Sequence, residues 1–110
     1  MKPNIYIPNS GCHDFSAAKH FGKLITLSKG ALNLYSIGGL YRLMEPILLN
    51  STKEDYILIC GPTVANVVAT TIFTHLHGKL NLLIYHVDKK GKGRYKRRNI
   101  SYKNRRSLND

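Results

Sequence analysis

Short apolar runs alternate with segments of helical periodicity along most of the chain. The apolar runs predict β-strands, because they are rich in aliphatic residues and are bounded by residues that favour turns; they cover residues 4–7, 24–27, 56–60 and 80–85. The segments between them predict helices, at residues 15–21, 34–48 and about 62–77. Strand and helix therefore alternate, which is typical of an α/β layer fold with a mostly parallel sheet.

Individual residues refine the ends of these elements. Pro46 is expected to kink or end the second helix near Glu45, because proline lacks the N–H that an inner helical turn uses. Asp14 is expected to cap the first helix, and Gly78 follows the third helix as a typical C-terminal residue. The run at 56–60 is continuously apolar, which is typical of a strand that is buried on both faces.

Charge divides the chain into two parts. Residues 1–88 contain seven Lys or Arg and five Asp or Glu, a net charge of +2, whereas residues 89–110 contain ten Lys or Arg and one Asp, a net charge of +9. Residues 89–93 predict a hairpin turn into a weak strand at about 94–102. We therefore predict one α/β domain at residues 1–88 that folds without the remainder of the chain. Its fold is a small Rossmann-like layer fold with a mostly parallel four-stranded sheet, followed at 89–110 by a C-terminal hairpin strand and basic tail.

The composition of the 110 residues excludes several classes of protein. A hydrophobic content of 43% and a charged content of 21% exclude a wholly disordered chain. The longest mainly apolar run, residues 64–73, is shorter than the ~20 residues that span a membrane, so we expect no membrane partner. Neither cysteine belongs to a CxxC pair, and His75 and His77 face different directions on a helix, so we expect no metal and no cofactor.

Polar residues follow each predicted strand at its carboxyl end. In open α/β sheets these ends meet at one edge, and ligands bind there. Two expected helix starts, near Asp14 and Thr63, direct backbone N–H groups to the same edge, where they favour a phosphate or carboxylate. The predicted site for such an anion, possessing the chemistry to hold a nucleotide, consists of Asn9, Ser10, His13, Asp14, Lys29, Gly61, Thr63, Asn66 and His86.

These residues also have structural interpretations. Asp14 is a candidate helix cap, and Asn9 and Ser10 are candidate turn residues. His13 beside Asp14 is a candidate general base with its orienting group, although adjacent side chains seldom point at each other. His86, at a strand end, is a candidate either for the site or for a structural histidine.

The basic C-terminal segment interleaves tyrosines with cations. Lys and Arg side chains neutralise phosphates, and tyrosine rings stack on unpaired bases. A basic strand of this kind suits a position along a nucleic acid backbone. The residues predicted to contact nucleic acid or another polyanion are Lys89, Lys90, Lys92, Arg94, Tyr95, Lys96, Arg97, Arg98, Tyr102, Lys103, Arg105 and Arg106.

Three short segments within residues 4–86 carry a resemblance. They are His13-Asp14-Phe15-Ser16-x-Ala18, Asp55-Tyr56-Ile57-Leu58-Ile59 and His77-Gly78-Lys79-Leu80-Asn81-Leu82-Leu83-Ile84-Tyr85. With the richness in Asn, Lys, Ile and Tyr, they make the chain similar to small phage-encoded α/β proteins of unassigned function. The resemblance implies a viral accessory or virion-associated protein, located in the host-cell cytoplasm or within a viral particle. It implies no catalytic residue.

We predict from these patterns a non-enzymatic basic protein that binds nucleic acid or a nucleotide-like anion, with the basic tail supplying electrostatic attraction. Two alternatives stay open. One is a structural subunit of a larger assembly or homo-oligomer, such as part of a phage virion. The other is a small phosphodiesterase or nucleotide-processing enzyme that uses His13, Asp14 or His86.

Overall fold

The computed structural model of the chain describes residues 2–11, 14–31 and 35–101. Its elements in chain order are β1 (Asn4–Ile7), the 3₁₀ helix η1 (Ser16–His20), β2 (Lys23–Thr26), α1 (Ile37–Leu48), β3 (Tyr56–Leu58), α2 (Thr63–His77), β4 (Lys79–Val87) and β5 (Gly93–Ser101). Strand and helix alternate up to β4, which confirms the α/β class predicted from the apolar pattern.

The strands form one sheet in the order β2-β1-β3-β4-β5. Neighbours among the first four are parallel, whereas β5 is antiparallel to β4 along its whole length, from Lys79 opposite Ser101 to Val87 opposite Gly93. The mostly parallel sheet and the antiparallel C-terminal hairpin are therefore confirmed. The sheet has five strands rather than four, because β5 belongs to it.

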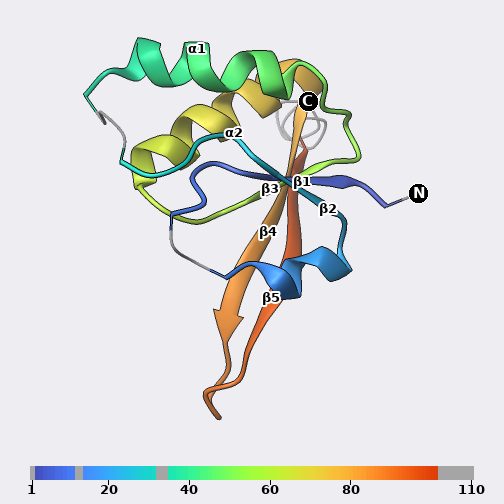
Figure 1. The fold of residues 1–110 in the computed structure, drawn as a ribbon. Coiled ribbons are helices and arrows are strands. Elements are labelled where there is room, and N and C mark those ends of the chain that lie inside the picture. The colour runs from blue at the N-terminus through green and yellow to red at the C-terminus, as the bar shows by residue number, and fades with distance from the viewer. Residues whose placement is uncertain (1, 12–13, 32–34, 102–110) are drawn as a thin grey trace, which may run out of the picture.

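The helices cover the two faces of this sheet unequally. α1 and α2 lie side by side on one face, and the short η1 lies on the other (Figure 1). The chain moves from β1 to β2 in one direction across the sheet, and from β2 to β3 and β4 in the opposite direction. Right-handed connections require the helix to change face when the direction reverses, which explains this arrangement.

Side chains that alternate along the central strands bury both faces of the sheet. Ile5 and Ile7 of β1 point to one face and Tyr6 to the other, and all three are buried. The larger cluster, under α1 and α2, is formed by Tyr6, Leu27, Leu40, Met44, Leu48, Ile57, Ala65, Val68, Ala69, Ile72 and Phe73. The smaller cluster, under η1, is formed by Ile5, Ile7, Ala18, Leu58 and Leu83.

The second helix does not end near Glu45 as expected, because α1 continues through Pro46 to Leu48. Pro46 lies in the last turn of α1 and is exposed, and it supplies no N–H to the carbonyl of Arg42 four residues earlier. Met44 and Leu48 on either side of it are fully buried. Packing of these two side chains against the core therefore outweighs the missing hydrogen bond.

Two other elements differ in extent from the prediction. β3 ends at Leu58 instead of residue 60, because the backbone of Cys60 bonds with the side chain of Asn66. The first helix is a five-residue 3₁₀ helix and not an α-helix. Asp14 is not the cap that was predicted, because Phe15 occupies the N-cap position and no side chain caps the helix there. From one residue earlier, the Asp14 carboxylate accepts the N–H of Ser16 at 2.9 Å, a local turn of the kind that Asp side chains form.

The domain boundary expected after residue 88 falls in the turn between β4 and β5. In this turn the N–H of Asp88 donates to the carbonyl of Lys92 at 2.9 Å, and the N–H of Gly91 donates to the carbonyl of Asp88 at 3.0 Å. The hairpin strand is thus continuous with the sheet of the body. Independent folding of residues 1–88 stays a prediction.

Candidate functional site

The loop after β3 is closed by the side chain of Asn66. Its Oδ1 accepts the N–H of Cys60 at 3.1 Å, and its Nδ2 donates to the carbonyls of Cys60 and Pro62 at 2.8 and 2.9 Å. Gly61 has a φ of +75°, a conformation that L side chains rarely adopt, and a Cβ there would lie 3.3 Å from the carbonyl oxygen of Asn9. Asn66, a predicted ligand residue, therefore has its amide engaged in shaping the loop.

The loop after β1 is held in a similar way. Asn9 is buried, and its Nδ2 donates to the Ser28 hydroxyl at 3.2 Å and to the Gly30 carbonyl at 2.9 Å. The N–H of Ser10 donates to the carbonyl of Ser28 at 3.1 Å. The Cys60 thiol donates to the carbonyl of Asn9 at 3.5 Å, which joins this loop to the loop after β3. Hydrogen bonds thus link the two loops beyond the carboxyl ends of β1 and β3.

A pocket of about 420 Å³ opens beside these loops, on the η1 face of the sheet. Its walls come from the start of η1, the end of β3 and the β4–β5 hairpin. Its lining residues are Asp14, Phe15, Ser16, Ala17, Leu58, Ile59, Cys60, Gly61, Tyr85 and Tyr95. The pocket therefore lies where open α/β sheets bind ligands, beyond the carboxyl ends of the strands.

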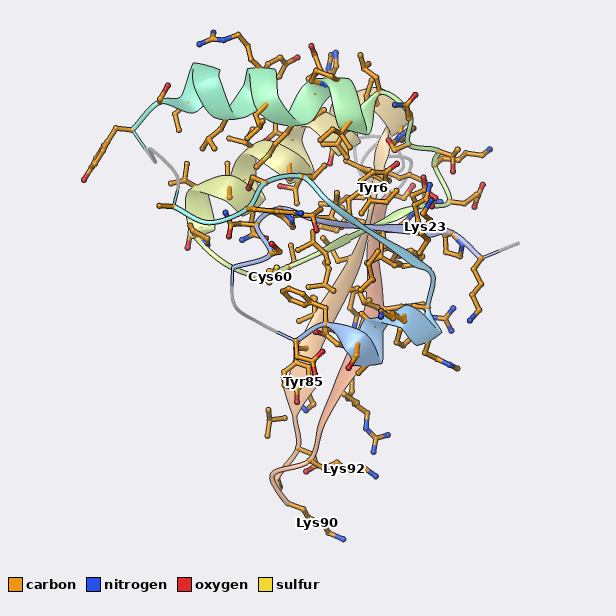
Figure 2. All side chains as sticks on the ribbon, in the orientation of Figure 1. Tyr6, Lys23, Cys60, Tyr85, Lys90 and Lys92 are labelled. Atoms are coloured by element: carbon orange, nitrogen blue, oxygen red, sulfur yellow. The ribbon has the colours of Figure 1, made fainter. Side chains whose placement is uncertain are left out.

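Two tyrosines of the hairpin form one wall of the pocket. Tyr85 of β4 is directly opposite Tyr95 of β5, and their ring centroids are 5.1 Å apart with the ring planes inclined at 64°. Tyr85 retains 54% of its surface exposed, and its ring lies beside η1 (Figure 2). Tyr85 is not among the residues that the sequence predicts for a site. The two tyrosines are equally far from Lys90, within the predicted turn, and this spacing is the signal that would have paired them.

The titratable groups of the pocket leave it with a negative rim and a neutral interior. Hydrogen bonds from Ser16 hold the pKa of the Asp14 carboxyl below its ordinary value. Burial raises the pKa of the Tyr95 phenol, and Cys60, Tyr85 and Asp14 raise it further. Burial also raises the pKa of the Cys60 thiol, so this cysteine is a weak nucleophile at neutral pH.

The structure brings only part of the predicted strand-end site together. Asp14 and Gly61 line the pocket, whereas Lys29 and Thr63 are exposed and do not line it. His86 is exposed and alternates with Tyr85 along β4, so its side chain is on the opposite face of that strand. His13 lies outside the described residues. The anion site as a whole stays a prediction.

The β4–β5 hairpin extends beyond the rest of the sheet. β3 pairs with β4 only at Leu82 and Leu83, so residues 84–87 continue past the end of β3 together with the first residues of β5. Figure 1 shows this hairpin projecting away from α1 and α2. Figure 2 shows Lys90 and Lys92 at its tip, pointing away from the body.

The hairpin is strongly cationic. Residues 89–101 include seven Lys or Arg and no Asp or Glu; six of the seven are exposed, and Lys96 is half-buried. Asp88 precedes them, and its Oδ1 accepts the backbone N–H groups of Lys90 and Lys92, both at 2.9 Å. The carboxylate therefore shapes the turn. The cations predicted to contact nucleic acid within the described residues are Lys89, Lys90, Lys92, Arg94, Lys96, Arg97 and Arg98; Tyr102, Lys103, Arg105 and Arg106 lie outside them.

A family model described as phage Pam3 gp32-like protein matches residues 3–102 of the chain. The chain belongs to this phage Pam3 gp32-like family. The match confirms the resemblance to small phage-encoded proteins that the sequence carries. A search of curated proteins found no match, and neither did a search of solved structures.

A second hollow, of about 630 Å³, lies beside the amino ends of β1 and β3 in this family member. Its lining residues are Lys2, Pro3, Asn4, His20, Phe21, Thr52, Glu54, Asp55, Tyr56 and Arg97. Asp55 is buried there, and its Oδ1 and Oδ2 accept the N–H groups of Asn4 and Thr52 at 2.9 and 2.8 Å. The Asp55 carboxylate thus joins the start of β1 to the loop before β3, so Asp55 has a structural role.

The histidine pair of α2 is separated in space. His77 lies 2.8 Å from the Ser51 hydroxyl through Nε2 and packs edge-on against Phe73, whereas His75 is exposed. Across the described ranges, no three His, Cys, Asp or Glu side chains lie close enough to hold a metal ion. In the same part of the chain, no helix is long and apolar enough to cross a membrane.

Proposed function

We propose that this phage protein is a non-enzymatic nucleic-acid-binding protein that binds the phosphate backbone through its β4–β5 hairpin. The observation that carries the proposal is the projecting hairpin itself, with seven Lys or Arg between residues 89 and 101 and no carboxylate among them. Cations clustered on one projecting element attract a polyanion at long range, because their fields add.

The alternation of residues along β5 supports the same function. Arg94, Lys96 and Arg98 are every second residue of the strand, so consecutive members of this set are about 6.6 Å apart along it. A regular row of charges of this kind follows an extended phosphate backbone. Tyr95 and Arg97 occupy the intervening positions.

The body supplies the platform from which the hairpin extends. The strand order, with its reversal between β1 and β3, supports a Rossmann-like fold of the doubly wound kind, and such folds bind nucleotides at the reversal. A small phage protein with this function acts on nucleic acid in the host cytoplasm or inside the viral particle.

Salt dependence of binding tests the proposal. Binding to phosphates releases counterions, so the logarithm of the association constant for a DNA duplex falls linearly with the logarithm of salt concentration. Replacing Arg94, Lys96 and Arg98 by Gln removes three phosphate contacts, and we expect the slope to become shallower by about 2.7, at roughly 0.9 per phosphate. All duplex sequences weaken about equally, because phosphate contacts carry no sequence information.

A matched variant separates local contacts from total charge. Lys23 of β2, Arg42 of α1 and Lys53 of the loop before β3 are exposed, and they lie outside both the hairpin and the predicted anion site. Replacing these three residues by Gln removes the same net charge, and we expect the slope to stay close to that of the parent. A slope near zero in the parent protein would overturn the proposed function.

One observation favours assembly as a second function. Among the described residues, β5 is the outermost strand on its side of the sheet and is nine residues long, so the edge that it presents there can pair with a strand of another chain. Lys and Arg on an edge strand repel a second copy of the same strand. The partner is then an acidic protein. In that case we expect a stable complex with a fixed ratio of the two chains, and an association constant for DNA that does not change with salt concentration.

A further inference from the structure

We propose that the pocket between η1 and the hairpin receives one unpaired base of a single-stranded nucleic acid whose backbone follows β5. This inference rests on the proposed function and names its substrate class. The pocket is of a size that holds a small planar ligand, since ligand pockets of about 300–1,000 Å³ are typical of proteins. The pocket lies at the root of the cationic hairpin, on the face of β5 that carries Tyr95 and Arg97. Arg94 also borders an adjoining hollow, whereas Lys96 and Arg98 line none of these hollows.

The lining of the pocket favours a base over a phosphate. Phe15, Tyr85 and Tyr95 supply aromatic surface, and bases of any sequence stack on such rings. None of the described lining residues is a Lys or Arg, and the ionised Asp14 at the rim repels a phosphate. The same carboxylate accepts a hydrogen bond from the N–H groups on the edge of a base.

Two further hollows continue from the pocket along η1 and β5. The first, of about 460 Å³, shares Ala17 and Tyr95 with the pocket. Its other lining residues are His20, Phe21, Lys92, Gly93 and Arg94. The second is the hollow of about 630 Å³ described above, which begins at Phe21 and is bordered by Arg97. The three hollows adjoin one another through shared lining residues, and they are the path that we propose for the strand. The first is aromatic with Asp14 at its rim, the next is bordered by Lys92 and Arg94, and the last is bordered by Lys2 and Arg97 as well as by Glu54 and Asp55.

This path distinguishes a strand from a free nucleotide. A mononucleotide fills the aromatic pocket but reaches few of the cations, whereas a strand fills the pocket and also contacts Lys92, Arg94 and Arg97. A duplex reaches the cations but keeps its bases stacked and paired, so the pocket stays unused. We therefore expect single strands to bind more tightly than duplexes of equal length, and both to bind more tightly than a mononucleotide.

The variant Tyr85→Leu tests the inference on the full chain. It keeps apolar bulk at the pocket wall and removes the ring. The probes are a labelled oligothymidylate of about 15 nucleotides, within the range that one single-strand-binding domain covers, and a DNA duplex of the same length. We expect binding of the oligothymidylate to weaken about 5- to 150-fold, the loss of one stacked base, and duplex binding to change less than about twofold.

Two control variants and a third probe complete the experiment. Tyr85→Phe keeps the ring and is expected to bind the oligothymidylate like the parent. Tyr35→Leu removes an exposed tyrosine before α1, outside the hairpin, and is expected to change neither affinity. Thymidine monophosphate is expected to compete at least about 100-fold more weakly than the oligothymidylate, because it lacks the neighbouring phosphates.

The outcomes separate failure of the inference from failure of the proposed function. Equal loss of single-strand and duplex binding in Tyr85→Leu would overturn the base pocket, as would an unchanged single-strand affinity, while the salt-dependent duplex binding would keep the proposed function intact. Competition by thymidine monophosphate as strong as that of the oligothymidylate would make the pocket a nucleotide site and overturn the single-strand claim. Absence of salt-dependent binding in the parent would remove both proposals together.

Discussion

The phenol of Tyr85 lies across Gly93, at the place where a side chain on residue 93 would begin. A Cβ at Gly93 would be 1.8 Å from the Tyr85 Oη and 2.2 Å from its Cζ. The two residues are not directly opposite, because Tyr85 pairs with Tyr95 and Gly93 pairs with Val87. The ring therefore reaches diagonally across the hairpin, and the missing side chain of Gly93 sets its position in the pocket wall.

Gly93→Ala is expected to move the Tyr85 ring, because a methyl group and the phenol cannot occupy the same space. Single-strand binding should weaken to about the extent expected of Tyr85→Leu. Stability should change by less than about 1 kcal/mol, because the clashing atoms belong to the far end of a half-exposed side chain that can move aside. Asn99→Ala, an exposed position on the same strand, is the control. The measurements are oligothymidylate affinity and urea unfolding; parental affinity in Gly93→Ala would show that the ring position has no part in binding.

Asn66→Ala is expected to destabilise the protein by about 2–4 kcal/mol. The substitution leaves the N–H and carbonyl of Cys60 without the partners that the amide supplies, and an unsatisfied buried group costs about 1–3 kcal/mol. Urea unfolding measures the change, with Thr63→Ala, at the exposed first residue of α2, as control. A loss no larger than that of Thr63→Ala would mean that the loop does not depend on the Asn66 amide.

Pro46→Ala is expected to stabilise the protein. Alanine restores an N–H in the last turn of α1, and proline is about 3 kcal/mol less favourable than alanine inside a helix. The more flexible unfolded chain offsets about 1 kcal/mol of that gain, so we expect a net increase of about 1–2 kcal/mol in the free energy of unfolding. Pro62→Ala, at the start of α2 where proline fits the backbone, should give no such increase. An unchanged or lower urea midpoint for Pro46→Ala would contradict this account of the turn.

His77 is expected to make the protein less stable in mild acid. Burial lowers the pKa of this imidazole; Asp55 opposes that shift and Lys79 adds to it. The folded protein thus holds a proton on His77 less readily than the unfolded chain. The stability that this group contributes is present above its unfolded pKa of about 6.5 and declines as the pH falls below that value.

The melting temperature between about pH 7.5 and pH 5 checks this sign. We expect His77→Gln to reduce the acid-induced decrease in melting temperature, and His75→Gln, at an exposed position of the same helix, to leave it as in the parent. An identical decrease in the parent and in His77→Gln would assign the acid sensitivity to other groups.

Local patterns were sufficient for the elements and for the charge of the hairpin. The apolar runs predicted the four parallel strands, and α2 ends at His77 with Gly78 after it, as expected. The concentration of cations after Asp88 is visible in the composition alone. Both kinds of signal depend on residues that are close in sequence, so no knowledge of the fold was needed to read them.

The ends of elements were less predictable where distant residues compete for them. Pro46 stays helical because Met44 and Leu48 are buried under the core, and β3 stops early because Asn66 takes the backbone groups of Cys60. Each outcome is decided by a contact between elements. Propensities of single residues contain no information on such contacts.

The sequence by itself determined the α/β class, the alternation of strand and helix that makes the sheet mostly parallel, and the basic character of the hairpin. These features follow from periodicity and net charge, which are properties of the chain. Only the tertiary structure decided which polar residues share a site. The side chains of Asn9 and Asn66 bond within the loops, and His86 is on the face of β4 opposite to Tyr85. Asp14, Phe15 and the two hairpin tyrosines instead line one pocket. The physical reason is that strand register and the two loop closures, set by hydrogen bonds between distant residues, decide which way each side chain points.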